Sequence, residues 1–235
     1  MNTELPQGQS ARDDFPRFGL LQYAYRFPGE IEHVRLRISG EGLDTEDLDN
    51  PLAGLARVAQ SSDFHCVTTW SHRALRWSGV RFADFYLRHI APRLAPGSQV
   101  TTVVLRGQDG YRTTLPLEDL LAADVLLADS LDDKPLGIEH GAPLRVVAPS
   151  HYGYKSVKHV ARMEFCEGVP KVKPAALAFM DHPRARVEFE ERGRWLPGWL
   201  LRHVYRLLIR PVVYLFAKAM TRHAANSFTR YRAFR

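Results

Sequence analysis

A single cysteine in a stretch rich in basic side chains is the first candidate for chemistry. Cys66 lies in the run from Asp63 to Ser71, which reads Asp-Phe-His-Cys-Val-Thr-Thr-Trp-Ser. Four basic side chains are close to it in the sequence: His65, His72, Arg73 and Arg76. A thiolate is a soft ligand for a soft metal centre, and positive neighbours would stabilise it. The alternative interpretation is a buried cysteine that acts as a small hydrophobic residue.

Two basic, glycine-containing segments form the second candidate. Residues 139–145 read Glu-His-Gly-Ala-Pro-Leu-Arg, and residues 152–158 read Tyr-Gly-Tyr-Lys-Ser-Val-Lys. Arginine can donate two parallel hydrogen bonds to a phosphate, lysine adds a point charge, and exposed backbone N–H groups complete an anion site. The residue spacing of a P-loop is absent. A solvated basic strand edge would have the same composition, so both interpretations stay open on these residues alone.

The cysteine count limits the redox chemistry. The two cysteines, Cys66 and Cys166, are a hundred residues apart, so no CxxC pair, zinc ribbon or haem attachment site can be built from them. A thiol peroxidase would need Cys166 as its resolving thiol. The default for Cys166 is a structural residue at the end of a strand.

These candidates must be positioned by a mixture of strands and short helices. Apolar patterns predict strands at residues 34–38, 64–70, 101–105, 144–148 and 157–165. They predict helices at 51–59, 82–90 and 117–122, an irregular segment at 1–20 and a turn at 107–110. Because strands and helices do not alternate regularly, an α+β fold is preferred to a doubly wound sheet.

Composition and charge distribution separate a body from a tail. The chain has 235 residues, 45% of them hydrophobic and 25% charged, which excludes collagen, coiled coil and wholesale disorder. Residues 184–235 hold 12 Lys/Arg and 3 Asp/Glu (+9), whereas residues 1–183 hold 20 and 23 (−3), which together give the net +6. The high pI therefore belongs to the tail, and no nucleic acid partner is expected. We predict two parts: 1–183 and 184–235.

The basic tail predicts an amphipathic helix. Residues 195–220 are rich in Leu, Val, Trp and Tyr, with Arg202, Arg206 and Arg210 spaced four apart, and Pro211 is expected to end or kink the helix. A membrane-spanning helix is disfavoured, because each arginine would cost about 2.5–3.5 kcal/mol near the bilayer centre. Two interpretations remain for 195–223: a helix on an anionic membrane surface, and a helix docked on a partner or on the body.

The N-terminal residues do not predict a cleaved export signal. They read MNTELPQGQSARDDFPRFGLL, without a basic region followed by an apolar one. We expect a cytoplasmic protein, with a peripheral position at the inner face of the membrane as an option.

Taken together and in order, the motifs resemble the molybdopterin domain of the sulfite oxidase family, above all its short, single-domain bacterial members. The resemblance covers roughly residues 5–183. It is carried by Phe64–Ser71, Trp77–Val80, Asp109–Tyr111 with Leu115–Leu121, Glu139–Arg145 and Lys155–Lys158. It implies a mixed β-sheet, α+β domain that binds a molybdenum–molybdopterin cofactor, here with a helical basic tail.

The resemblance also implies roles for individual residues. Cys66 would be the molybdenum ligand. The residues expected at the pterin and its phosphate are His65, Asp109 (or Gly107 beside it), His140, Arg145, Lys155, Ser156, Val157 and Lys158. The candidates for the substrate pocket are His65, His72, Arg76, Tyr111 and His151, with Arg76 and Tyr111 taken as catalytic candidates.

The implied reaction is a two-electron oxygen-atom transfer. The substrate would be a small oxyanion such as sulfite, which is oxidised, or a sulfoxide or N-oxide, which is reduced, and the sequence leaves the direction open. The haem and dimerisation domains of larger members have no counterpart, so we expect a separate electron partner, for instance a membrane haem or quinone protein. Where short members often carry Asp-Asn, this chain has His72 to Arg76, and a cationic pocket wall there would favour an anionic substrate. The alternative is a non-catalytic module on the same fold that binds an anion or a partner through its basic tail.

Overall fold

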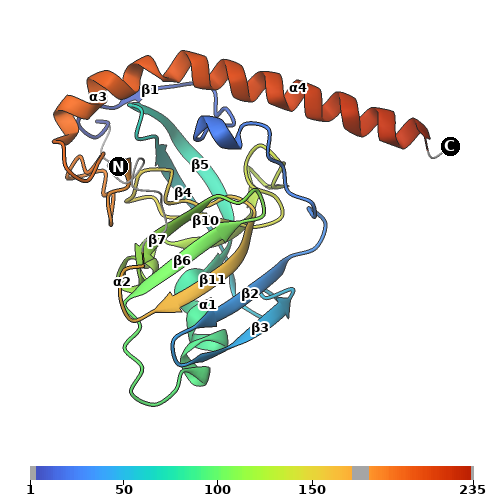
Figure 1. Ribbon diagram of the computed structural model, residues 1–235, viewed down its shortest axis with the longest axis vertical. Coiled ribbons are helices and arrows are strands. Elements are labelled where there is room, and N and C mark those ends of the chain that lie inside the picture. Colours follow the sequence, from blue (N-terminus) through green and yellow to red (C-terminus); the bar gives the residue numbers. More distant parts are fainter. Residues whose placement is uncertain (1–3, 171–179, 234–235) are drawn as a thin grey trace.

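Two β-sheets and a pair of C-terminal helices make up the architecture (Figure 1). The computed structural model describes residues 4–170 and 180–233, with side chains up to residue 226. In Figure 1 the two sheets occupy the centre of the molecule, and the last two helices run along one edge of it.

The first sheet has six strands in the order β1–β5–β8–β10, with β4 paired to β5 and β9 paired to β8. β1 runs parallel to β5, and the other pairs are antiparallel. Its strands are β1 (Ser10–Ala11), β4 (Arg57–His65), β5 (Trp70–Arg81), β8 (Leu126–Leu131), β9 (Lys134–Pro135) and β10 (Arg145–Val147).

The second sheet has five strands in the order β3–β2–β11–β6–β7. β2 and β11 are parallel, although their neighbours pair antiparallel, so this sheet is mixed as well. Its strands are β2 (Arg35–Gly40), β3 (Leu43–Asp49), β6 (Thr102–Gly107), β7 (Arg112–Pro116) and β11 (Val160–Cys166). Mixed sheets with few helices confirm the α+β prediction.

The helices are short except at the C-terminal end. The α-helices are α1 (Phe82–His89), α2 (Leu117–Leu120), α3 (Gly198–Leu207) and α4 (Ile209–Ala233), and two 3-10 turns are η1 (Leu21–Tyr23) and η2 (Ala91–Arg93). α1 follows β5 directly and buries Phe82 and Phe85 in the core.

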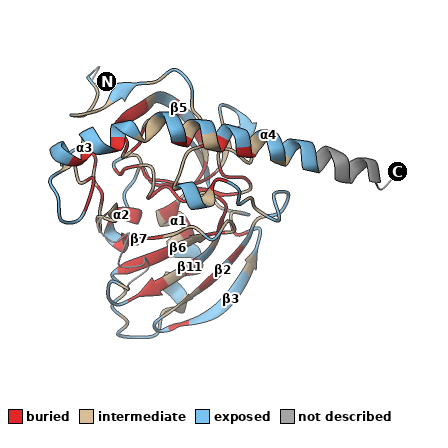
Figure 2. Ribbon diagram, turned by 45° about the horizontal axis from the view of Figure 1, so that its top comes forward, coloured by how far each residue is buried: buried red, intermediate tan, exposed pale blue. Residues whose placement is uncertain are grey.

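The main hydrophobic core joins the two sheets and α1. Alternate residues along each strand point into it, as a strand buried on one face requires. Figure 2 shows many buried positions along the strands of both sheets. The core includes Leu36 and Ile38 from β2, Val103 and Leu105 from β6, Leu127 from β8 and Met163 and Phe165 from β11.

Two of the secondary-structure predictions near Cys66 are wrong. The helix expected at 51–59 is a turn followed by β4, because Gly54 adopts a positive φ of 77° and the chain then pairs with β5 from Arg57 onward. The strand expected at 64–70 is a reversal between β4 and β5: the amide of Thr69 donates to the carbonyl of Cys66 at 3.1 Å. Cys66 thus lies at a turn.

The tail helix also breaks earlier than expected. The interruption is at Leu208, between α3 and α4, and Pro211 lies in the first turn of α4, where its missing N–H is not needed. The inner face of α4 packs on the N-terminal segment through a cluster of Ala24, Val212, Phe216 and Ala219. This contact matches the interpretation in which the helix docks on the body. Among the described residues no helix is long and apolar enough to cross a membrane.

The stretch before α3 is joined closely to the body. Arg184 pairs with Asp119, and the fully buried Arg192 donates to the carbonyls of Val67 at 2.7 Å and Gly8 at 3.1 Å. The division of the chain at 183 stays a prediction, and these contacts show that the two parts share an interface.

Candidate functional site

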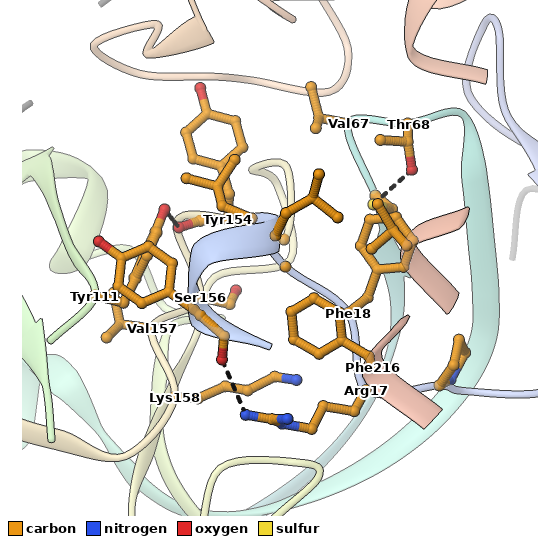
Figure 3. Close-up of a pocket in the computed structure, with 18 of the residues that line it drawn as sticks. Arg17, Phe18, Val67, Thr68, Tyr111, Tyr154, Ser156, Val157, Lys158 and Phe216 are labelled. Atoms are coloured by element: carbon orange, nitrogen blue, oxygen red, sulfur yellow. Dashed lines mark hydrogen bonds between the residues drawn. The ribbon is translucent and has the colours of Figure 1, made fainter. Parts of the chain in front are cut away.

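A cavity of about 480 Å³ brings together parts of the chain that are far apart in sequence. Its wall is formed by the N-terminal segment 15–23, the turn 64–70, the loop from Gly153 to His159, and the start of α4 with Leu208 just before it. Asp109 and Tyr111, from the turn between β6 and β7, complete it. Figure 3 shows side chains from these segments converging on the same space.

Cys66 is one of the residues of this wall. The residue is 7% exposed, and the hydroxyl of Thr68 lies 3.1 Å from Sγ, the contact drawn at the upper right of Figure 3. Burial raises the pKa of the thiol, while the Thr68 hydrogen bond and the charges of Arg192 and Lys158 act against that rise. A cationic metal at the sulfur would favour the thiolate directly, since a coordinated thiol loses its proton.

The loop after β10 supplies Ser156, Val157 and Lys158 to the cavity. Nζ of Lys158 donates to the carbonyl of Glu139 at 2.8 Å. Burial, together with the neighbouring charges of Arg145 and Arg17, lowers the pKa of Lys158 to about 7. Because burial and the neighbouring cations disfavour the charged ammonium form, an anion that binds beside Lys158 would stabilise that form.

Arg17 is a second cation in the wall, and the sequence analysis missed it. Its guanidinium carbon lies 4.3 Å from the ring centre of Phe27 and 5.0 Å from that of Phe216, and it donates to the carbonyl of Arg26 at 2.7 Å. In Figure 3 it lies beside Lys158 at one end of the cavity.

Two predicted cofactor residues lie behind the wall. Arg145 is fully buried and donates to the carbonyls of His140 at 2.9 Å and Ser156 at 3.3 Å, so it ties two loop segments together. Burial lowers its pKa to about 9. The ring of His140 stacks on Phe15, a wall residue, at 4.7 Å, and burial next to Lys158 and Arg145 lowers its pKa to about 3.

Lys155 points away from the cavity. Its Nζ donates to the carbonyls of Thr114 at 2.7 Å and Pro183 at 2.9 Å, and the residue is fully buried. Its placement supports a structural role, in which it joins β7 to the segment around Pro183, and gives no support to a cofactor contact.

The turn between β6 and β7 places three more predicted residues at or next to the cavity wall. Tyr111 lies in the wall and donates its hydroxyl to the carbonyl of Tyr154 at 2.7 Å, and Asp109 lies beside it with a pKa that burial raises. Gly107 approaches the carbonyl of Lys158 so closely that a Cβ would lie 2.5 Å from it.

Four candidates for the substrate pocket do not line the cavity. Their partners are Ser71 for His65, the carbonyl of Asp13 for His72, Asp133 for Arg76 and Asp119 for His151. Arg76 is exposed and lies 2.9 Å from Asp133, so the cationic pocket wall expected at His72 to Arg76 is not part of this cavity. The reason is the long β5 strand, which carries Arg76 away from the turn that holds Cys66.

The wall residues that the sequence analysis missed come from both ends of the chain. Leu208, Val212 and Phe216 are spaced four apart, a helical signal that was visible in the sequence. The segment 15–23 gave a weaker signal, its aromatic content, in a stretch expected to be irregular.

The charges of the site fit a group that carries both phosphate and a soft metal. Arg17 and Lys158 outnumber the carboxylate of Asp109 in the wall, and Arg145 adds a buried charge behind it. Nδ1 of His140 is buried and has no hydrogen-bond partner among the described residues. A phosphate would compensate the cations, a polar ring system could use the histidine nitrogen, and Cys66 provides a sulfur ligand.

Comparisons with known proteins agree with this chemistry. The chain is 39% identical to the uncharacterized oxidoreductase YuiH of Bacillus subtilis over 109 residues, which cover 46% of this chain and 52% of YuiH. It is 32% identical over 168 residues to the protein-methionine-sulfoxide reductase catalytic subunit MsrP of Xanthomonas axonopodis, which covers 62% of this chain and 52% of MsrP. Mitochondrial sulfite oxidase of Drosophila melanogaster is 24% identical over 188 residues, which cover 63% of this chain and 32% of the sulfite oxidase.

This chain spans about half the length of the first two relatives and about a third of the third. The match to the family described as oxidoreductase molybdopterin binding domain runs over residues 25–171. It includes the Cys66 turn and the loop of Lys158, whereas the wall segments 15–23 and 208–216 lie outside it. The chain therefore belongs to the family of oxidoreductase molybdopterin-binding domains.

Proposed function

We propose that this chain is a molybdenum-dependent oxidoreductase that transfers an oxygen atom to or from a small substrate. The observation that carries the proposal is the convergence in one cavity of the Cys66 sulfur with the cations Lys158 and Arg17. A soft ligand and an anion site within one wall suit a cofactor that holds both a metal and a phosphate. The relatives, named as an oxidoreductase, a sulfoxide reductase and a sulfite oxidase, support the same class.

Each wall residue has a physical task in this proposal. When bound, the molybdopterin cofactor supplies a metal that changes oxidation state by two electrons as an oxygen atom is transferred. Cys66 would be the protein's ligand to that metal, and the Thr68 hydroxyl, 3.1 Å from Sγ, holds the sulfur in place and limits its negative charge. Lys158 would neutralise the phosphate. The apolar residues Phe18, Val212 and Phe216 exclude water from the cavity.

The wall favours a neutral substrate with apolar substituents. Most of its members are aromatic or aliphatic, and Arg76, the residue that suggested an anionic substrate, pairs with Asp133 outside the cavity. We therefore favour sulfoxide reduction over sulfite oxidation. In a balanced reaction the sulfoxide takes up two electrons and two protons, its S–O bond breaks, and a thioether and water leave. The electrons come from a separate reductant, such as a reduced haem protein or a quinol.

Metal analysis of the purified chain tests the proposal. The chain is expressed in a host that makes molybdenum cofactor, and molybdenum and pterin are measured beside the Cys66→Ser variant. We expect near-stoichiometric molybdenum in the parent and a lower content or an altered molybdenum spectrum in the variant. Cys166→Ser is the matched control and should retain the parent's content, because Cys166 packs on Val104 in the other sheet.

The substrate class is tested on the loaded protein. A reduced dye serves as electron donor for a dialkyl sulfoxide, and an oxidised dye serves as acceptor for sulfite. Faster turnover of the sulfoxide supports the apolar-substrate proposal, and faster turnover of sulfite contradicts it. A folded parent without molybdenum or pterin would favour the alternative of a binding module that acts through its basic tail.

A further inference from the structure

The outward side of α3 carries a cluster of exposed apolar side chains that nothing in the described structure covers. We name this cluster the outer apolar face; it consists of Trp195, Leu196, Trp199, Leu200, Val204, Leu207 and Tyr214, which are 41–77% exposed. Its helical members in α3 lie at positions i, i+1, i+5 and i+8, which fall on one side of a helix. The opposite side of α3 buries Leu201 and Tyr205. Exposed apolar patches of this kind mark interaction sites.

A row of cations continues from this face along α4. Arg206, in the last turn of α3, is exposed, as are Arg210, Lys218 and Arg222 of α4. The three cations of α4 share their helical stripe with Tyr214, since residues 210, 214, 218 and 222 are spaced by four. The buried residues of α4, Val212, Phe216 and Ala219, lie on the opposite side. The apolar cluster of α3 and the cationic stripe of α4 therefore lie on the sides of the two helices that are not packed on the body, and Figure 2 shows exposed positions along both helices.

The shape and charge of this surface fit a lipid bilayer that contains anionic lipids. From Arg192 to Arg235 the chain has ten Lys/Arg and no Asp/Glu. The two helices form a nearly continuous outer edge of the molecule (Figure 1), and at 1.5 Å per residue they span about 50 Å, so a flat surface can contact the whole row at once. Exposed Trp and Leu beside a row of Lys and Arg are typical of helices that lie in the membrane–water interface.

We propose that the outer apolar face of α3 inserts into the headgroup region of an anionic membrane while the cations of α4 contact the lipid phosphates. The inner side of α4, with Leu208 just before it, forms one wall of the candidate cofactor cavity through Leu208, Val212 and Phe216. The docked chain would hold that cavity about one helix diameter, roughly 10 Å, from the membrane surface. Membrane docking does not depend on the chemistry proposed above, and a membrane-embedded reductant would be within reach if that chemistry holds.

Vesicle flotation with the full chain, as purified from the host that makes molybdenum cofactor, tests the inference whether or not the cofactor is bound. The probes are vesicles of phosphatidylcholine alone and of phosphatidylcholine mixed with phosphatidylglycerol, at low and at high salt. We expect binding to the mixed vesicles, weaker binding at high salt and a blue shift of Trp195 and Trp199 fluorescence. Replacing both Trp199 and Leu207 by Ser should weaken the partition coefficient at least about tenfold, because apolar area no longer leaves water. Replacing both Arg206 and Arg210 by Gln should weaken it about tenfold and reduce the salt dependence.

Matched substitutions on α1 provide the control, because this helix lies on the far side of the sheets from α4 in Figure 1. Leu87 is 64% exposed and Arg88 is exposed, so Leu87→Ser and Arg88→Gln change the same chemistry without touching the tail. Both variants should bind vesicles like the parent. The inference is overturned if the parent fails to bind mixed vesicles, or if the tail variants bind as well as the parent. It is also overturned if the Trp199 and Leu207 changes alter only the oligomeric state, which would assign the face to a second copy.

Discussion

At the scale of single residues, burial decides which protonation state each polar group of the cavity adopts. His159 lies in the cavity wall, is 1% exposed, and its Nδ1 lies 2.6 Å from the carbonyl of Ala142. Burial, and to a lesser degree the charges of Lys158 and Arg17, lowers its pKa to about 4 from a usual value of 6.5, despite the hydrogen bond to Ala142. The neutral ring is therefore the stable form inside the folded protein.

This shift predicts a loss of stability in mild acid. Above pH 6.5 the His159 ring is neutral in both states; as the pH falls from 6.5 towards 4, the unfolded chain binds a proton that the folded chain does not. His159 alone should reduce the free energy of unfolding by on the order of 2 kcal/mol at about pH 5 relative to neutral pH. Urea unfolding of the cofactor-free chain at both pH values measures the difference.

Two substitutions separate the contribution of His159 from that of other groups. His159→Asn keeps a side-chain N–H for Ala142 and removes the titration, so its stability should depend less on pH than that of the parent. His33→Asn, at an exposed position, should keep the parent's pH dependence. Equal slopes for the parent and His159→Asn would show that this imidazole is not held neutral.

At the scale of elements, α4 both closes the cavity and depends on the N-terminal segment for its position. Phe216 is 3% exposed, lies against the guanidinium of Arg17 and packs with Ala24. Gly19 approaches it so closely that a Cβ there would lie 3.3 Å from the Phe216 ring. The amphipathic helix is thus stabilised by tertiary contacts on one side more than by its intrinsic propensity.

Removing this contact should release α4 from the body. Phe216→Ala deletes a buried aromatic side chain, and we expect the free energy that docks α4 on the body to fall by about 3 kcal/mol. Hydrogen exchange of amides 208–222 should accelerate, and limited proteolysis should cut the tail faster. Tyr214→Ala, at a position that is 67% exposed, should leave both measurements unchanged. Unchanged exchange in Phe216→Ala would mean that other contacts hold the helix.

At the scale of the whole molecule, Arg192 joins three distant segments. Its guanidinium donates to the carbonyls of Gly8 and Val67 and lies 3.1 Å from the carboxylate of Glu190, and the residue is fully buried. Val67 follows Cys66 directly, so this one side chain links the N-terminal segment, the turn of the candidate metal ligand and the start of the tail.

Loss of this link should destabilise the fold and the cofactor site together. Arg192→Leu leaves the carbonyls of Gly8 and Val67 without this donor and leaves Glu190 with only the longer Arg202 contact at 3.7 Å, and breaking a buried pair costs about 3–5 kcal/mol. Thermal unfolding should show a lower Tm, and the molybdenum content after purification should fall. Arg194→Leu removes an exposed arginine two residues later and should change neither. A parent-like Tm in Arg192→Leu would contradict the proposed role.

Local sequence patterns predicted the elements that local forces decide. The β-branched run 101–105 corresponds to β6, a strand buried on both faces, and the helical spacing of 82–90 corresponds to α1, which buries one face. The same patterns failed at 51–59 and 64–70, where Gly54 and Thr69 adopt positive φ values and the partner strand β5 determines where β4 begins and ends.

The candidate site likewise has features that the sequence determines and features that only the tertiary structure determines. The sequence by itself determined the chemical groups, since Cys66, the Ser156–Lys158 loop and Tyr111 are recognisable from residue type and order, and all of them line the cavity. Only the tertiary structure decided which cations face it: Arg17 enters from the N-terminal segment, while Lys155 turns to backbone carbonyls and Arg76 to Asp133. A side chain's direction depends on the twist and register of its strand and on partners many residues away, and neither can be read from neighbouring positions in the sequence.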